Sequence, residues 1–131
     1  MIYLALYGST EKKIGIKEIS DQLGIPTPFL GKILQLLARH RILDSIKGPH
    51  GGFSLNRPAI DIPLMDIIRI IDGTEVFDSC VIRTTRCSQE SPCSLHDKIA
   101  PARKEMKGIF LTETIADLAA EFRQGRERIR I

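Results

Sequence analysis

The 131-residue sequence contains no hydrophobic run long enough to cross a lipid bilayer. Its apolar start, MIYLALYGS, lacks the basic region that opens a secretory signal and runs into the charged residues of EKK. We therefore expect a cytoplasmic protein without membrane contact, whose first residues belong to a core helix. The length suits one domain with a real core, and the composition, 43% hydrophobic and 27% charged, is ordinary for a globular protein.

The sequence also lacks the residue constellations that catalysis requires. It contains no recognisable nucleophile–base pair, no glycine-rich phosphate loop and no paired carboxylates placed for acid–base chemistry. Internal repeats and low-complexity segments are absent as well. We therefore expect the protein not to be an enzyme, and a small redox carrier is the weaker alternative.

Acidic residues are missing from residues 22–43, a segment that holds Lys32, Arg39 and Arg41. Residues 1–57 carry eight Lys or Arg against four Asp or Glu, a charge of +4, whereas residues 58–131 carry eleven against twelve. A basic face on a small domain indicates a polyanionic partner such as nucleic acid. A solvated helix face would produce the same charge pattern and is the alternative.

Residues 17–38 predict two helices joined by a tight turn. Apolar spacing predicts a first helix over Lys17–Leu23, and Gly24 is a typical helix end. Thr27 and Pro28 predict the next start, as the N-cap and the first helical residue. Apolar residues then recur at helical spacing as far as Ala38. This arrangement is the outline of a helix-turn-helix.

A β-hairpin is expected directly after these helices. Two short runs, Leu43–Lys47 and Gly52–Leu55, flank the Gly- and Pro-rich turn of IKGPHGGFSL. A helix-turn-helix followed by a hairpin is a winged helix. The predicted fold class is therefore mainly α: a winged helix-turn-helix with a three-helix core, a β-hairpin wing and a long C-terminal dimerisation helix.

The second half of the chain predicts three further features. A helix containing Leu64 and Ile71 should stop at Asp72-Gly73, and residues 74–92 form a loop without periodicity. Ser91-Pro92 should then start a long helix, kinked at Pro101, whose apolar positions recur from Leu95 to Phe110. Such a seam favours packing on a twin subunit, with packing on its own domain as the alternative. A short helix capped by Thr112 or Thr114 closes the fold.

We expect two regions within one intertwined domain. Residues 1–73 would form the winged helix-turn-helix DNA-binding region. Residues 74–131 would supply the cysteine loop, the dimerisation helix and the C-terminal helix.

The predicted second helix and wing supply the candidate DNA-binding residues. In a helix-turn-helix the start of the second helix reaches base edges in the major groove, and a cation on a narrow wing suits a minor groove. Lys32 can meet a phosphate or guanine and Gln35 an adenine, while Phe29 can contact a thymine methyl or pack in the core. The wing glycines allow a close backbone approach to phosphate. The candidates are Thr27, Pro28, Phe29, Gly31, Lys32, Gln35, Lys47, His50 and Arg57.

Two alternatives accompany this assignment. The winged helix could serve protein contacts instead of DNA, and His50 could be an exposed turn residue without a partner.

The three cysteines lie close together, as Cys80-x6-Cys87-x5-Cys93-x2-His96. An odd number of cysteines without a secretion signal indicates a thiol or metal site rather than a disulfide framework. A Cys₃His set could bind zinc or an iron–sulfur cluster, and the absence of a Cys-x2-Cys pair favours the cluster. The alternatives are thiols without metal and a surface or helix-capping His96.

The chain resembles the Rrf2 family of bacterial transcription regulators, of the IscR/NsrR type. The resemblance covers nearly the whole chain and rests on KEISDQLGIPTPFLGKILQLLARHRIL, KGPHGGFSL, LMDIIRIIDG and three cysteines followed by SLHDKIAPAR. It implies a homodimeric winged-helix regulator that binds double-stranded operator DNA and pairs its long helix across the dimer.

The resemblance also implies a cofactor. Cys80, Cys87 and Cys93 would bind an iron–sulfur cluster, 2Fe–2S in preference to 4Fe–4S, and His96 matches the histidine that completes the set in some members. Other members use an N-terminal carboxylate from the second subunit. The wing cation of the family corresponds to Lys47. The expected function is transcription regulation modulated by a cluster that senses redox state, nitric oxide or iron–sulfur status. A regulator that uses thiols or no cofactor is the alternative.

This sequence departs from the family pattern at three places. Gly31 stands where an acid is common in the recognition helix, His50 replaces a wing glycine, and Pro101 interrupts a helix usually free of proline. Family members also usually carry more residues before the segment that matches IYLAL.

Overall fold

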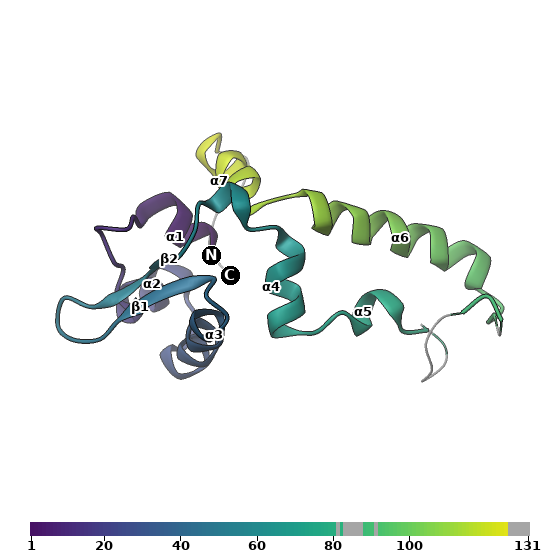
Figure 1. Cartoon of the computed structure of the whole chain (residues 1–131), viewed down its shortest axis with the longest axis horizontal. Coiled ribbons are helices and arrows are strands. Elements are labelled where there is room, and N and C mark those ends of the chain that lie inside the picture. Colours follow the sequence, from purple (N-terminus) through teal and green to yellow (C-terminus); the bar gives the residue numbers. More distant parts are fainter. Residues whose placement is uncertain (81, 83–87, 91, 126–131) are drawn as a thin grey trace.

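A computed structural model describes residues 1–80, 82, 88–90 and 92–125 (Figure 1). This part of the chain is mainly helical, with a single two-stranded sheet, so the predicted fold class is confirmed. None of its helices combines the length and the apolar character needed to pass through a membrane. The elements in chain order are α1 (Ile2–Tyr7), α2 (Ile16–Leu23), α3 (Thr27–Arg39), β1 (Leu43–Ile46), β2 (Gly52–Leu55), the 3₁₀ turn η1 (Ala59–Asp61), α4 (Leu64–Ile71), α5 (Glu75–Asp78), α6 (His96–Thr112) and α7 (Ile115–Arg123).

The two helices of the helix-turn-helix form as the sequence predicts. Gly24 ends α2 in the left-handed conformation, with φ of 69°, and α2 and α3 bury their apolar faces in one core. The start of α3 differs from the expectation. Pro26 is the N-cap and Thr27 is already helical, and the Thr27 hydroxyl donates to Ser20 Oγ at 3.0 Å instead of capping. The buried core side chains of these helices are Ile19, Leu23, Leu30, Leu34 and Leu37.

The wing is a hairpin braced by a third segment. β1 and β2 pair antiparallel, with Leu43 opposite Leu55 and Ile46 opposite Gly52. Ile14 exchanges two backbone hydrogen bonds with Phe53, at 2.9 and 2.8 Å, so the segment before α2 lies against β2. This approach requires Gly52, because a Cβ there would lie 2.5 Å from the Ile14 carbonyl oxygen.

The region after the wing contains one helix that the sequence did not predict. α4 ends before Gly73, which has a φ of 78°, as expected. The short helix α5 then interrupts the predicted loop, and α6 begins at His96 rather than at Ser91-Pro92. α6 contains Pro101 in its second turn, where proline removes one backbone hydrogen bond of the helix.

The last helix returns to the N-terminal body. Thr114 caps α7 in a reciprocal capping box with Asp117, which confirms the second of the two predicted caps. α7 packs mainly against α1 and η1, so the C-terminal region is not separate from the winged helix. Whether residues 1–73 and 74–131 form functional regions stays a prediction.

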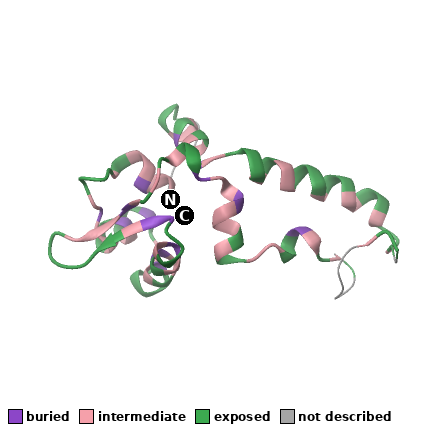
Figure 2. Cartoon of the chain, in the orientation of Figure 1, coloured by how far each residue is buried: buried purple, intermediate pink, exposed green. Residues whose placement is uncertain are grey.

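α6 extends away from this body as a long arm (Figure 1). Its main contacts are with α4 and α5, and in its last turn Phe110 meets Phe77 of α5 with ring centroids 5.7 Å apart. None of the α6 residues is buried (Figure 2). The apolar side chains of Met106 and Ile109 are 40% and 52% exposed. The described chain therefore leaves an apolar helix face without cover.

Candidate nucleic-acid interface

The outer face of α3 presents a row of exposed side chains. Phe29, Lys32, Gln35 and Arg39 recur at spacings of three or four residues and are all exposed, while Leu30 and its helical neighbours bury the opposite face. Phe29 is 60% exposed, so its alternative role in the core is wrong. The row therefore offers two cations, an amide and an aromatic ring to a partner.

The other three DNA-binding candidates at the start of α3 do not belong to this exposed row of side chains. Thr27 and Pro28 are exposed, but the Thr27 hydroxyl already bonds to Ser20. Gly31 is half-buried rather than exposed, and a Cβ at this position would lie 3.2 Å from Cδ1 of Ile16. Gly31 thus faces α2, where its lack of a side chain lets the two helices approach, so it does not belong to the exposed row, and its contact with DNA stays a prediction.

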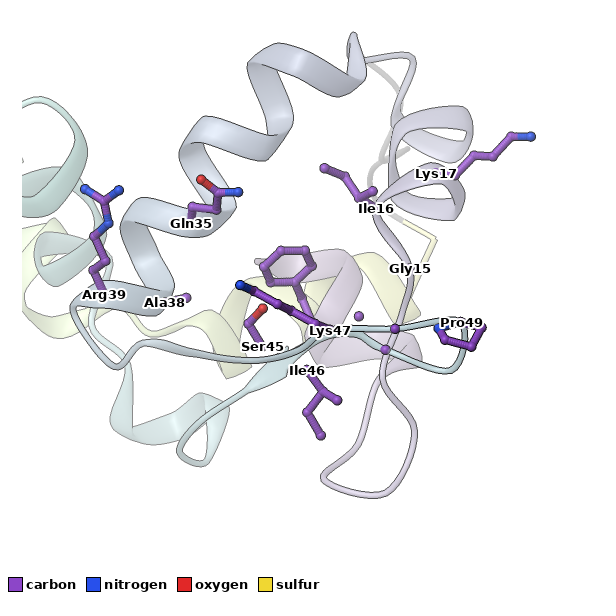
Figure 3. Close-up of a pocket in the computed structure, with 14 residues that line it drawn as sticks. Gly15, Ile16, Lys17, Gln35, Ala38, Arg39, Ser45, Ile46, Lys47 and Pro49 are labelled. Carbon is purple, nitrogen blue, oxygen red and sulfur yellow. The ribbon is translucent and has the colours of Figure 1, made fainter.

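An open groove of about 790 Å³ separates α3 from the wing. Figure 3 shows Gln35 projecting from α3 and Lys47 extending from the wing toward the same space. Lys17, at the start of α2, and Arg39, near the end of α3, also line the groove. Among the described residues that line it, none is acidic. A groove bordered by three cations and no carboxylate can accept a polyanionic strand.

The three wing candidates occupy different places. Lys47 lies in the groove. His50 is exposed at the wing tip and does not line the groove. Arg57, after β2, is partly buried and donates through Nη2 to Asp66 Oδ2 of α4 at 2.7 Å. The ion pair links the end of the wing to α4, and contact of Arg57 with DNA stays a prediction.

Sequence reasoning did not single out Lys17 and Arg39 as binding residues. In the sequence, Lys17 marks only the first residue of a predicted helix, and Arg39 only adds to the local basic charge. Both reach the groove because α2, α3 and β1 meet there in space. The one sequence signal that includes Arg39 is the acid-free stretch of residues 22–43.

The candidate metal ligands lie between α5 and α6 and at the first residue of α6. Cys80 follows α5, and the Cys93 carbonyl accepts a hydrogen bond from the His96 amide at 2.9 Å. The side chains of Cys80, Cys93 and His96 are all partly buried. Cys87 lies outside the described residues.

Thiolate and imidazole donors suit an iron–sulfur cluster chemically. However, no three His, Cys, Asp or Glu side chains among the described residues are grouped closely enough to hold a metal ion. The donor types fit a cluster, and their assembly around one stays a prediction.

The chain is similar to known transcription regulators over most of its length. The profile of the family described as "Rrf2: Iron-dependent Transcriptional regulator" matches residues 1–121. A protein of Aquifex aeolicus, provisionally assigned as an HTH-type transcriptional regulator, is 32% identical over 120 residues, which make up 90% of this chain and 82% of that protein.

Two solved structures share the fold. CymR, the global cysteine regulator of B. subtilis, superimposes with a TM-score of 0.73 at 23% identity, over 91% of this chain and 86% of CymR. IscR of T. potens also gives a TM-score of 0.73, at 21% identity, over 96% of this chain and 82% of IscR.

Proposed function

Because the chain belongs to the Rrf2 family of DNA-binding transcriptional regulators, which are not enzymes, we propose that α3 and the wing together form its operator-binding surface. The observation that carries the proposal is the acid-free groove between them. In this arrangement α3 enters the major groove, and the sugar–phosphate backbone runs through the protein groove toward the wing.

The residues divide into two roles on this surface. Phe29, Lys32 and Gln35 face outward from the first turns of α3, where side chains reach base edges. Lys17, Arg39 and Lys47 border the groove and neutralise phosphates. The exposed tip residue His50 would approach the minor groove beside the contacted backbone.

The salt dependence of binding tests the groove. Each lost phosphate contact reduces the slope of log K against log salt by about 0.9. We therefore expect Lys47→Ala to weaken binding to every duplex and to flatten this slope. The probe is a duplex selected in vitro from a random pool, with affinity measured by fluorescence anisotropy.

The matched control is Lys12→Ala, which removes an exposed lysine that does not line the groove. Its slope should equal that of the wild type. An unchanged slope for Lys47→Ala would remove the wing from the interface.

A homodimer held through α6 completes the proposed regulator. Leu95, Met106 and Ile109 are 39%, 40% and 52% exposed and recur at helical spacing along this arm. Two copies that pair these faces would bury them and present two copies of α3 to one operator. The family supports this assembly, because symmetric helix-turn-helix dimers read two half-sites.

We further propose that operator affinity responds to an iron–sulfur cluster, 2Fe–2S in preference to 4Fe–4S, held by Cys80, Cys87, Cys93 and His96. Such a cluster would supply a link between these ligands that oxidants, nitric oxide or iron loss can break. The family's description as iron-dependent supports this reading.

The chain itself provides a path from the cysteines to the dimer helix. Cys80 is two residues from α5, whose Phe77 packs on Phe110 of α6 and whose Asp78 pairs with Lys107. A displacement of Cys80 would therefore act on α6 and on the spacing of the two α3 helices.

Anaerobic purification tests the cluster directly. Brown protein that contains iron and sulfide is the expected result, and changing Cys80, Cys87 and Cys93 together to Ala should abolish both the colour and the difference in operator affinity between loaded and metal-free protein. Equal operator affinity of the triple variant and the loaded wild type would contradict the switch.

A cofactor-independent regulator is the second candidate. The observation in its favour is that the described residues group no three metal-binding side chains. Colourless, metal-free protein that binds the operator with full affinity would support it, whereas colourless protein containing zinc would indicate a zinc site.

A further inference from the structure

A second basic cavity, of about 310 Å³, lies between α5 and α6. Figure 1 places these helices on the opposite side of α4 from the wing, so the cavity is separate from the DNA groove. Asp78 and Phe77 border it from α5, and Arg103, Lys104 and Lys107 border it from α6. These three cations are neither proposed DNA contacts nor proposed cluster ligands.

The charges in this cavity do not balance. Lys107 Nζ lies 3.3 Å from Asp78 Oδ1, and both side chains remain partly exposed, at 40% and 47%. Arg103 and Lys104 are two further cations, so the described residues that line the cavity carry two more positive than negative charges. Arg103 is half-buried, and its planar guanidinium suits a carboxylate with two parallel hydrogen bonds. The electrostatic complement of this cavity is a dianion.

The cavity also has an apolar part. Phe77 is buried, with only 4% of its surface exposed, and Ala100 lines the cavity from α6. A small cavity with convergent cations and an apolar wall is suited to a short organic anion rather than to an extended polymer. Its volume is at the lower end of the range for small-molecule sites, about 300–1,000 Å³.

The cavity lies on a different face of α6 from the exposed apolar row. Ala100, Arg103 and Lys107 recur at spacings of three and four residues and face α5, whereas Met106 and Ile109 belong to the exposed row. Pairing of the apolar rows would therefore leave the cavity accessible.

We propose that this cavity binds a small organic dianion, a short dicarboxylate, with Arg103 and Lys107 holding its two carboxylates. This assignment does not depend on DNA binding, but the cavity adjoins the proposed cluster site, because His96 also lines it. Asp78 pairs with Lys107 and would compete with the ligand for it. Removal of the Asp78 charge should therefore strengthen ligand binding, whereas removal of the Arg103 charge should weaken it.

Isothermal titration with malonate tests the site on the full chain, with ionic strength held constant by chloride. We expect one binding event per chain. Arg103→Gln should weaken it by roughly tenfold, because it loses a charge-assisted hydrogen bond, and Asp78→Asn should tighten it because Lys107 is released. Circular dichroism melts establish that both variants are folded.

Two charge-matched controls lie elsewhere on α6. Lys98 and Glu105 are exposed and do not line the cavity, so Lys98→Gln and Glu105→Gln should leave malonate affinity unchanged. Absence of binding, or equal effects in these controls, would overturn the proposal. Loss of binding in Lys47→Gln would overturn it too, because it would place the anion in the DNA groove.

Discussion

Phe29 is an exposed aromatic residue in a row that is otherwise polar. It is 60% exposed at the start of α3, one helical turn from Lys32. Burial of such a ring against a partner is favourable. The 5-methyl of thymine is the apolar group that the major groove offers. At the scale of single residues, Phe29 is therefore the candidate that should read thymine.

Replacing thymine by deoxyuridine in the selected operator tests this role, because the change removes only the methyl group. We expect the wild type to lose roughly fourfold in affinity for each contacted methyl, the equivalent of about 0.8 kcal/mol. Phe29→Ala should bind both duplexes equally. Fluorescence anisotropy at fixed salt measures the four affinities.

Ile60→Ala is the control for this cycle. Ile60 is 67% exposed but lies in η1 and lines neither of the two cavities. It should retain the wild-type preference for thymine. The same preference in Phe29→Ala would exclude Phe29 as the reader.

Part of the proposed binding surface could be predicted from the sequence. Lys32, Gln35 and Lys47 follow from local motifs, because helix spacing and a turn flanked by strands place them. Lys17 does not, because its place on the groove depends on how α2 packs beside the wing. The partial burial of Gly31 does not follow from local motifs either, since only the packed structure shows Ile16 against it.

At the scale of elements, Lys13 anchors the wing to the preceding segment. Its side chain is only 9% exposed, donates to Ser54 Oγ at 2.7 Å and pairs with Asp44 of β1. Ser54 is 1% exposed. The pair, together with the Ile14–Phe53 bridge, fixes a wing that has only two strands of its own.

Lys13→Met should therefore destabilise the fold by about 1–3 kcal/mol, because Ser54 loses its partner in a buried position. Urea denaturation measures the free energy of unfolding. Ser54→Ala in the Lys13→Met background should cost much less than Ser54→Ala alone. Additive costs would show that the two side chains do not interact energetically.

The same contact predicts a pH dependence. The hydrogen bond and charge of Lys13 lower the pKa of Asp44 below its usual value. A lowered carboxyl pKa contributes stability above the unfolded pKa, about 4, and loses it as the pH falls through the folded pKa. The melting temperature of the wild type should thus fall further than that of Asp44→Asn when the pH is lowered from about 5 to about 3. Equal losses would contradict this role for Asp44.

Element prediction succeeded where local signals are strong. α2, the hairpin and α7 have apolar spacing, a left-handed glycine or a capping box. α5 spans only Glu75–Asp78 and has no side-chain cap, and its one buried residue, Phe77, packs against distant α6. The predicted start of α6 was also wrong. Ser91-Pro92 resembles an N-cap followed by a first helical residue, but α6 begins at His96.

At the scale of the whole molecule, α6 is the element on which the proposed homodimer depends. It extends from the body with no buried residue, although Met106 and Ile109 are apolar. A stable dimer interface usually buries about 1,200–2,000 Å² in total. Pairing of two α6 helices along their length would contribute to that buried area, and it would set the distance between the two α3 helices.

Ile109→Glu tests the paired arm. Twofold symmetry would place the new carboxylate twice in one apolar interface, so we expect the dimer dissociation constant to rise by roughly 100-fold or more. Analytical ultracentrifugation measures the assembly, and the monomer should keep its helical circular dichroism because Ile109 is 52% exposed in the single chain. Operator affinity should fall in parallel. Ile60→Glu, the same change at an exposed isoleucine of η1, should leave the dimer intact. A dimer of unchanged affinity in Ile109→Glu would assign this face of α6 to a different partner.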